Sequence, residues 1–396
     1  MTHRERILTA IRGETPDHIP WVPRLEFWYR ARLRTGNMPA ELRGLSLHQV
    51  AERLGVGCYA SVPDFTHREE ETDMADRGLG IFNLPVLPYR VVLEGVDRVV
   101  HSGGVHSGRE IVTEYRTPAG SLRTAEIFTE EMLDAGASIS WVTESAIRQP
   151  DDFATAAWIF SHLKVEPRPD AYEAHRRAVG DRGVAVAYVI GTACPIHHIM
   201  KELMPVEQFF YAMHDYPEKI AQLNDAMEPY YAAIERLVAE SPAEVALLGG
   251  NYDDSITHPR FFEKHILSPL RNYAEVLHSK GKYLMTHTDG ENRRLMPLYL
   301  EAGFDIADSV CPAPMTHLTL DEILAAFRDR ITVWGGIPSV LLCPDSVSDA
   351  QFERWIDDLF ERYGRQSRFV LGVSDMVTAD ASWDRLAYIT RKISTL

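Results

Sequence analysis

The sequence has few cysteines, no long apolar run and no concentration of basic residues, and each absence argues against a class of protein. The four cysteines are far apart and form no Cys-x-x-Cys pair, which disfavours a disulfide framework or a structural zinc knuckle. No apolar run approaches a membrane span, and residues 1–20 form a charged helical pattern without the apolar core of a signal peptide. The sequence therefore predicts a cytoplasmic protein that uses no membrane.

Charge and composition narrow the choice of partner. The formal net charge is -16, and no basic stripe suited to nucleic acid is present. The 396 residues are 45% hydrophobic, which is ample for a large core, and no linker or low-complexity tract divides them. We therefore expect one domain over residues 1–396, acting on a small molecule.

Short apolar runs recur along the chain, and from residue 183 onward helical patterns separate most of them. The runs are 19–23, 56–62, 183–191, 244–250, 283–287, 305–310, 331–337 and 368–373. Segments 206–240 and 259–281 between them repeat apolar residues at helical spacing, and Gly281 is well placed to end the second helix. This alternation predicts parallel strands, and eight of them favour a closed (β/α)8 TIM barrel, with an open doubly wound sheet as the alternative.

One segment breaks this rhythm. Residues 86–128 read as antiparallel β structure, with strand-like runs on both sides of the Thr-Pro-Ala-Gly stretch at 117–120. We expect a β-hairpin insertion in the N-terminal half of the barrel.

Polar residues follow the strand-like runs, where a parallel barrel builds its active site. His287 and Asp289 lie two residues apart, so both side chains can point the same way if the extended geometry persists. With Cys311 and Asp375 they would make a nitrogen, oxygen and sulfur set suited to zinc. Each has a structural alternative. His287 can be a hydrogen-bonded structural residue, and Asp289 precedes a glycine as turn residues do. Asp375 can cap the helix that begins near residue 381 or bind Arg385, and Cys311 can be a small buried hydrophobe.

Other candidates would contact the substrate or move protons. The substrate-binding candidates are Arg24, Glu26, Trp28, Asn251 and Tyr252, with Phe27 as a further aromatic neighbour. Asp254 and Asp289 are the candidate catalytic carboxylates. The alternatives are an ion pair between Arg24 and Glu26, a turn at Asp254, and core packing for the aromatic side chains.

Several motifs together resemble a known superfamily. The N-terminal segment 1–23, the TPAG hairpin, and the THTDG, CPAP and WGGIP stretches are similar to the uroporphyrinogen decarboxylase superfamily over nearly the whole chain. The resemblance implies a (β/α)8 barrel and either cofactor-free decarboxylation or zinc-dependent methyl transfer. THTDG, CPAP and WGGIP look most similar to the corrinoid-system methyltransferases, which include O-demethylases of methoxylated aromatics.

The resemblance also implies a metal site. His287 falls where zinc methyltransferases have the histidine of a His-x-Cys pair, but Asp289 replaces the cysteine. The cysteine of the last strand falls at Ser374 or Asp375. Fewer thiolates make a harder site, which favours polarisation of an oxygen over activation of a thiol. The expected zinc ligands are His287, Asp289 and Asp375, with Cys311 as a further candidate; the alternative is that no metal binds.

These points lead to one expected function and two alternatives. The expected reaction moves a methyl group from a methoxylated compound to a corrinoid on a separate partner protein, because the chain has no DxHxxG-type cobalamin stretch. The resemblance also implies a possible homodimer. The first alternative is a metal-independent decarboxylase of an aromatic or pyrrolic acid, with Asp254 or Asp289 as proton donor and Arg24 holding a carboxylate. The second is a barrel that binds a ligand without catalysis.

Overall fold

A parallel sheet of six strands forms the centre of the molecule. The computed structural model describes residues 1–59, 75–102, 110–137 and 139–395. The strands are adjacent in chain order and comprise β11 (Val186–Ile190), β12 (Val245–Gly250), β13 (Tyr283–His287), β14 (Ile306–Val310), β15 (Thr332–Ile337) and β16 (Phe369–Val373). Four of them, β12, β14, β15 and β16, are buried at every residue. Such burial is typical of parallel strands that are covered on both faces.

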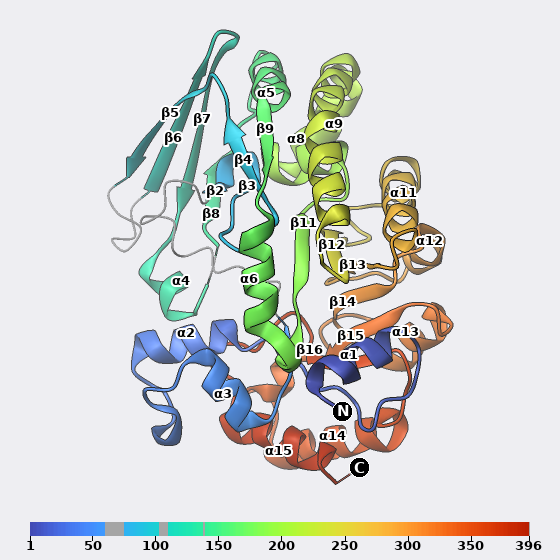
Figure 1. The fold of residues 1–396 in the computed structure, drawn as a ribbon. Helices are drawn as coiled ribbons and strands as arrows, with labels where there is room; N and C mark the ends of the chain where they lie inside the picture. The colour runs from blue at the N-terminus through green and yellow to red at the C-terminus, as the bar shows by residue number, and fades with distance from the viewer. Residues whose placement is uncertain (60–74, 103–109, 138, 396) are drawn as a thin grey trace.

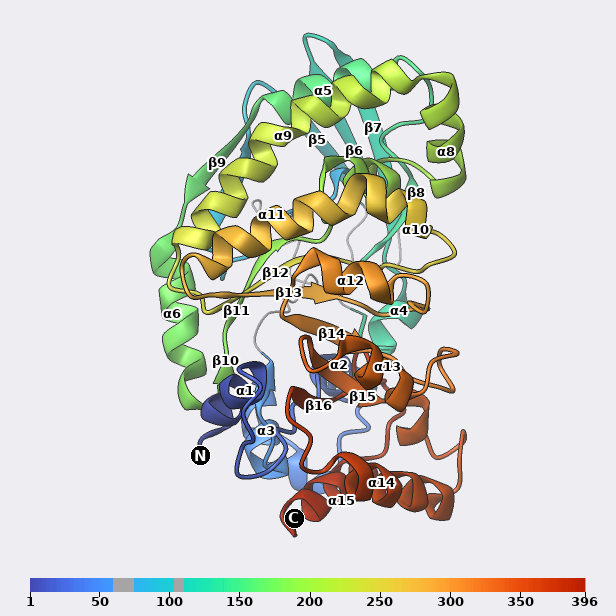
Figure 2. The same ribbon diagram turned by 90° about the vertical axis from the view of Figure 1, so that its right-hand side faces the viewer.

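Helices alternate with these strands along the chain and lie together outside the sheet (Figure 2). They are α9 (Pro217–Glu240), α11 (Leu267–His278), α12 (Met296–Ala302), α13 (Leu320–Phe327), α14 (Asp349–Tyr363) and α15 (Trp383–Ile393). Capping boxes start α13 at Thr319 and α14 at Ser348, which fixes where these helices begin. The predicted parallel α/β architecture is confirmed in this part of the chain.

Backbone contacts continue beyond both edges of the six-stranded sheet. Trp21 forms a parallel bridge with Leu371 of β16, and the amide of Gly57 donates to the carbonyl of Trp21 over 2.9 Å. The short strand β1 (Cys58–Tyr59) pairs in parallel with β10 (Gly183–Val184), which leads into β11. The predicted strand 19–23 is thus reduced to one bridge, and the end of the predicted strand 56–62 lies outside the described residues.

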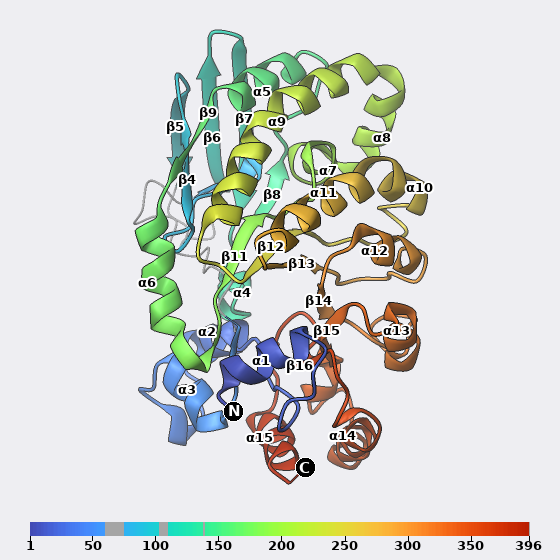
Figure 3. The ribbon, with the colours of Figure 1, turned by 45° about the vertical axis from the view of Figure 1, so that its right-hand side comes forward.

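A separate apolar cluster lies between these strands. Its buried members come from α1 (His3–Ile11), from Val22 and from every strand between β10 and β16; they are Ile7, Ala10, Ile11, Val22, Val184, Val186, Val245, Leu247, Met285, Ile306, Trp334 and Val370. The side chains that face the surrounding helices belong to a different and larger cluster. Helix α1 therefore packs at one end of the strands, the end at which both chain termini lie (Figure 3).

A second, antiparallel sheet stands beside the parallel one (Figure 1). It contains β5 (Asp97–Ser102), β6 (Glu110–Thr117), β7 (Gly120–Ile127) and β8 (Trp141–Glu144). Strands β6 and β7 form a hairpin at the TPAG stretch, where the sequence predicts one. The antiparallel structure extends beyond residue 128, because β4 (Tyr89–Leu93) pairs with β9 (Leu163–Pro167), which the sequence analysis did not identify.

The remaining elements are short. The helices are α2 (Glu26–Thr35), α3 (Leu47–Leu54), α4 (Glu130–Asp134), α5 (Asp152–Ser161), α6 (Pro169–Val179), α7 (Pro195–His198), α8 (Val206–Asp215) and α10 (Pro259–Phe261), and the strands are β2 (Ala75–Asp76) and β3 (Ile81–Phe82). Two π-helices are η6 (Ile199–Leu203) and η7 (Phe262–Ile266), and the 3-10 turns are η1 (Ala40–Leu42), η3 (Arg77–Leu79), η5 (Gly180–Arg182) and η8 (Ser339–Leu342). The predicted helix 206–240 is interrupted at Tyr216 because Pro217 starts a new helix. Among the described residues, no helix is both long and apolar enough to cross a membrane.

Glu235 on α9 makes the stability of the fold depend on pH. Burial, with a smaller contribution from Glu228, raises the pKa of Glu235 from 4.5 to about 7. The folded chain therefore binds this proton more tightly than the unfolded chain, so the free energy of unfolding falls as pH rises from 4.5 through about 7. Glu235→Gln is expected to raise it by about 1–3 kcal/mol at pH 8 and to change it little at pH 4.5, as measured by urea unfolding. The exposed Glu218→Gln on the same helix is the control, and an equal effect of Glu235→Gln at both pH values would contradict the prediction.

Candidate functional site

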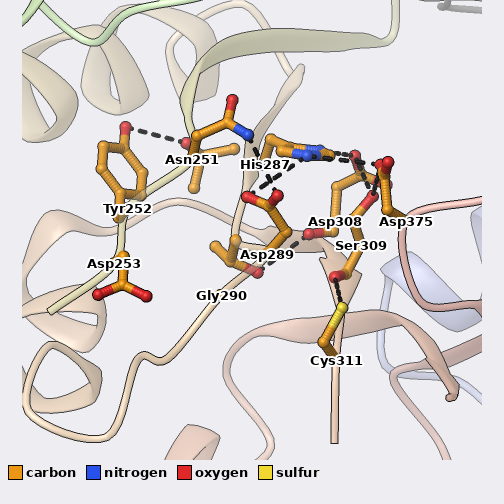
Figure 4. Close-up of polar contacts among 12 residues, drawn as sticks. Asn251, Tyr252, Asp253, His287, Asp289, Gly290, Asp308, Ser309, Cys311 and Asp375 are labelled. Atoms are coloured by element: carbon orange, nitrogen blue, oxygen red, sulfur yellow. Dashed lines mark hydrogen bonds and ion pairs between the residues drawn. The ribbon is translucent and has the colours of Figure 1, made fainter. Parts of the chain in front are cut away.

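His287 ends β13 and lies among three carboxylates (Figure 4). Its Nδ1 is 2.8 Å from Oδ2 of Asp308, and because a carboxylate only accepts, Nδ1 carries the hydrogen. Its Nε2 faces two other carboxylates, at 3.5 Å from Oδ1 of Asp289 and 3.6 Å from Oδ1 of Asp375. The predicted proximity of His287 and Asp289 is observed, and Asp375 joins them from beyond β16.

Arg24 and Ser309 complete this group. Nη1 of Arg24 donates to Oδ1 of Asp375 over 2.9 Å and to the hydroxyl of Ser309 over 3.2 Å. The same hydroxyl lies 3.2 Å from Asp308 and 3.3 Å from Asp375, so it can donate to either carboxylate. We refer to Arg24, His287, Asp289, Asp308, Ser309 and Asp375 as the His287 cluster.

The alignment of neighbouring strands places these residues together. In the parallel register, Gly250 of β12 stands beside His287, and His287 stands beside Asp308 of β14. The side chain of Asp308 is almost fully buried, so its charge requires the partners that His287 and Ser309 provide.

Strained backbone also concentrates here. Asn251 after β12, Ser309 in β14 and Ser374 after β16 have positive φ angles of 55°, 60° and 24°. Non-glycine residues adopt such angles only where the surrounding structure enforces them, and they are common at functional sites.

Neighbouring charges shift the pKa values of His287 and Asp289. Burial alone lowers the pKa of His287, but the charge of Asp289, together with the charge and hydrogen bond of Asp308, outweighs burial and raises this pKa to about 10. Burial alone raises the pKa of Asp289, whereas the charge of His287, with smaller contributions from Lys201 and Asn251, lowers it overall. Without a metal, His287 is therefore a cation at neutral pH, and Asp289 is an anion.

The spacing of the donor atoms in the His287 cluster can be compared with the spacing of ligand atoms around zinc. Ligand atoms at 2.0–2.2 Å from a tetrahedral zinc ion lie about 3.4 Å apart, close to the two separations of Nε2 from the carboxylates. Oδ1 of Asp289 is buried and has no hydrogen bond, and Asp308 holds the opposite ring nitrogen as carboxylates do for histidine ligands. Nε2 and these two oxygens are therefore donor atoms of the kinds that zinc takes. In the side-chain positions observed, no group of three or more His, Cys, Asp or Glu residues in the described part of the chain could hold a metal ion.

Cys311 is a correction to the predicted ligand set. Its thiol donates to the carbonyl of Ser309 over 3.3 Å (Figure 4). Burial raises the pKa of the thiol to about 11, so Cys311 is a protonated, buried side chain.

Both aromatic side chains predicted to contact substrate lie in the core. Trp28 is 0% exposed, and its indole donates to the carbonyl of Ala381 while it stacks on Trp383. Tyr252 is 0% exposed as well; its hydroxyl lies 3.2 Å from that of Thr286, and its ring stacks on His197. Both side chains therefore pack the core.

Asp254 is not placed as a proton donor. Its carboxylate accepts hydrogen bonds from the backbone and side chain of Arg294 at 2.8 and 3.1 Å and is almost fully buried. It fixes the loop after β12 to the loop before α12. Glu26 starts α2, and Nη1 of Arg24 pairs with Asp375.

The structure also brings in residues that the sequence analysis missed. Asp308 and Ser309 lie inside the apolar run 305–310, and a carboxylate inside such a run was a signal that could have found the first. Lys201, on η6, donates to Oδ1 of Asn251 over 2.7 Å, and Nδ2 of Asn251 donates to Oδ2 of Asp289 over 3.1 Å. Asn251 thus lies between Lys201 and Asp289, and its predicted contact with substrate stays a prediction.

Comparison with known proteins identifies a shared fold. No protein-family model matches the chain, and no curated protein sequence matches it. Among solved structures, the chain is similar to a methyltransferase from Methanosarcina mazei, with a TM-score of 0.53 and 13% sequence identity. The similarity covers 100% of this chain and 99% of the methyltransferase chain, so the two share their fold over the whole length.

Proposed function

We propose that this chain is a methyltransferase whose reaction takes place at the His287 cluster. The observation that carries the proposal is the convergence of Asp289 and Asp375 on Nε2 of His287, while Asp308 holds Nδ1. The full-length similarity in fold to a methyltransferase supports the same reaction class.

We further propose that the strands close into an eight-stranded (β/α)8 barrel. The supporting contacts are the bridge of Trp21 to β16, the hydrogen bond of Gly57 to Trp21, and the pairing of β1 with β10. The separate apolar cluster that α1 caps would then be the interior of the barrel. In this arrangement the His287 cluster lies at the carboxyl ends of the strands, where barrel enzymes have their active sites.

The residues that would hold zinc are His287 through Nε2, Asp289 through Oδ1 and Asp375 through Oδ1. Zinc bound there supplies Lewis acidity that stabilises negative charge on the atom that loses the methyl group. Asp308 keeps Nε2 available by holding the hydrogen on Nδ1. Arg24 neutralises part of the charge of Asp375 and limits its movement.

The methyl donor in this proposal is a methyl ether, and the acceptor is a Co(I) corrinoid on a partner protein. The carbon–oxygen bond breaks, its electron pair leaves with the oxygen, and two electrons of cobalt form the new bond to carbon. The departing oxygen then takes a proton. Protonated His287 can provide that proton where no metal occupies Nε2, because its raised pKa of about 10 is close to that of a phenol.

A donor screen tests the proposed function. The wild-type chain is incubated without oxygen with free Co(I) cobalamin and with methyl ethers, methylamines or methyl thioethers in turn. We expect methylcobalamin to form with at least one methoxylated aromatic compound. The loss of Co(I) absorbance measures its formation. Absence of transfer from every donor would contradict the proposal.

Metal content is a separate prediction. Untagged wild-type protein supplied with zinc is expected to bind about one zinc ion per chain, and His287→Ala and Asp289→Ala are expected to lose it. Cys311→Ser is the control and should keep the metal, because the thiol of Cys311 forms a hydrogen bond with the carbonyl of Ser309 in the wild type. Elemental analysis of the four proteins makes the measurement, and equal zinc content in all four would show that the cluster holds no metal.

A decarboxylase is the second candidate, favoured by the position of Arg24. Its guanidinium reaches the His287 cluster and can hold a substrate carboxylate. Loss of CO₂ leaves an electron pair on carbon, and protonated His287 is better placed to protonate it than Asp254, which Arg294 engages. Release of CO₂ from aromatic or pyrrolic acids after exhaustive chelation, without methyl transfer, would favour this candidate.

A further inference from the structure

Lys201 lies near the His287 cluster, on a segment that has no role in the proposed reaction or zinc site. It lies on the π-helix η6, which follows β11 and α7. π-Helices are rare and occur frequently at functional sites. Its ammonium group donates to Oδ1 of Asn251 over 2.7 Å and lies 3.5 Å from the carbonyl of Gly191.

The contacts of Asn251 fix which way its amide faces. A lysine ammonium can only donate, so Asn251 must present its oxygen to Lys201. Its Nδ2 then faces Oδ2 of Asp289 at 3.1 Å, and a carboxylate can only accept (Figure 4). Both ends of the amide are therefore matched, and a flipped amide would oppose two donors at one end and two acceptors at the other.

This arrangement decides which oxygen of Asp289 is available. Oδ2 is occupied by Asn251, whereas Oδ1 is buried without a hydrogen bond and faces Nε2 of His287 at 3.5 Å. A carboxylate held at one oxygen by a donor keeps its other oxygen in a fixed direction.

The backbone after β12 is bent to bring Asn251 to this position. Asn251 has a φ of 55°, and its backbone N–H donates to the backbone carbonyl of His287 over 3.1 Å. The preceding Gly250 approaches His287 so closely that a Cβ atom there would lie 2.6 Å from the Cβ of His287. Asparagine tolerates the left-handed conformation better than most residues, which suits it to a strained position that needs an amide side chain.

We propose that Lys201 is a positioning residue of this site: through Asn251, it holds the carboxylate of Asp289 with Oδ1 directed at Nε2 of His287. The consequence for catalysis rests on the proposed function of the cluster, whereas the orientation of Asp289 does not. Charge also links Lys201 to the site, because burial lowers the pKa of Lys201 and the negative charges of Glu202 and Asp289 oppose that lowering.

Crystal structures of variants test the orientation directly. In Lys201→Met we expect the Asn251 amide to lose its fixed direction and Asp289 to leave the orientation seen in the wild type. In Lys201→Arg, which keeps a donor, we expect that orientation to be retained. Asn251→Asp tests the contact between residue 251 and Asp289. It places a second carboxylate against Oδ2 of Asp289 and should turn Asp289 away. An unchanged Asp289 in both Lys201→Met and Asn251→Asp would overturn the inference.

Turnover supplies the second measurement. We expect Lys201→Met to lower kcat by about tenfold with an unchanged KM for the methyl donor, and Lys201→Arg to restore most of the loss. Lys219→Met is the matched control, because Lys219 also donates to a carbonyl, that of Pro150, but lies outside the cluster. A Lys201→Met enzyme with wild-type kcat would overturn the catalytic part of the inference. If Asp289 turns in the variants while the wild type transfers no methyl group, the proposed function fails and the positioning role stands.

Discussion

Replacement of His287 with alanine is expected to reduce methyl transfer by at least about a thousandfold, because it removes the ligand or proton carrier at the centre of the cluster. Nε2 of His287 is the atom on which Asp289 and Asp375 converge. Without the imidazole, three carboxylates share the site with Arg24 as the nearest cation in the cluster. The variant also leaves the buried Asp308 without its main partner, so part of any loss can come from stability.

His278→Ala controls for that contribution. His278 forms a comparable pair with Asp305, with Nε2 2.9 Å from Oδ2, but it lies on α11 outside the cluster. Circular dichroism of His287→Ala should match the wild type at the assay temperature, and His278→Ala should retain wild-type turnover. A folded His287→Ala enzyme with wild-type turnover would show that the cluster is not the reaction centre.

Asp308→Asn is expected to have the second largest effect, a loss of about 10–100-fold in both turnover and zinc affinity. The carboxylate of Asp308 accepts the hydrogen of Nδ1, so Nε2 is the ring nitrogen that would bind a metal. An asparagine can turn its NH₂ group toward Nδ1, which moves the hydrogen to Nε2 and directs it at Asp289 and Asp375. Competition with a chromophoric chelator measures zinc affinity independently of turnover.

Asp305→Asn is the matched control for Asp308→Asn. Asp305 lies just before the same strand, β14, and accepts a hydrogen bond from His278 at almost the same distance. The Asp305→Asn variant should keep the zinc affinity and turnover of the wild type. Equal losses in the two variants would mean that Asp308 acts on the stability of the strand rather than on His287.

The parallel sheet was predictable because each strand is a short apolar run that ends in polar residues. Strands β12 to β16 all begin within one residue of the predicted runs, since complete burial leaves a continuous apolar signature. The strand at 19–23 was predicted too long, because its pairing with β16 is a single bridge at Trp21, closed by backbone hydrogen bonds of Pro20 and Val22 with Leu371. Pairing is a tertiary property, and the hydrophobicity of Ile19 reflects its burial in the core.

The site was predictable where a polar residue follows a strand-like run or lies two residues from another candidate. His287 and Asp289 are close because they are two residues apart at a strand end. Asp308 joins them through the register between β13 and β14, which no local pattern encodes. Trp28 and Tyr252 show the opposite error, because residue type suggested a substrate contact and only the packing places both rings in the core.

The most direct test of the account follows the methyl group itself. A donor from the screen is prepared with a trideuterated methyl group, and the methylcobalamin formed by wild-type and His287→Ala protein is analysed by mass spectrometry. We predict trideuteromethyl cobalamin with the wild type, in proportion to the demethylated product, and background levels with His287→Ala. Equal labelling with both proteins, or a demethylated product without labelled cobalamin, would contradict methyl transfer at the His287 cluster.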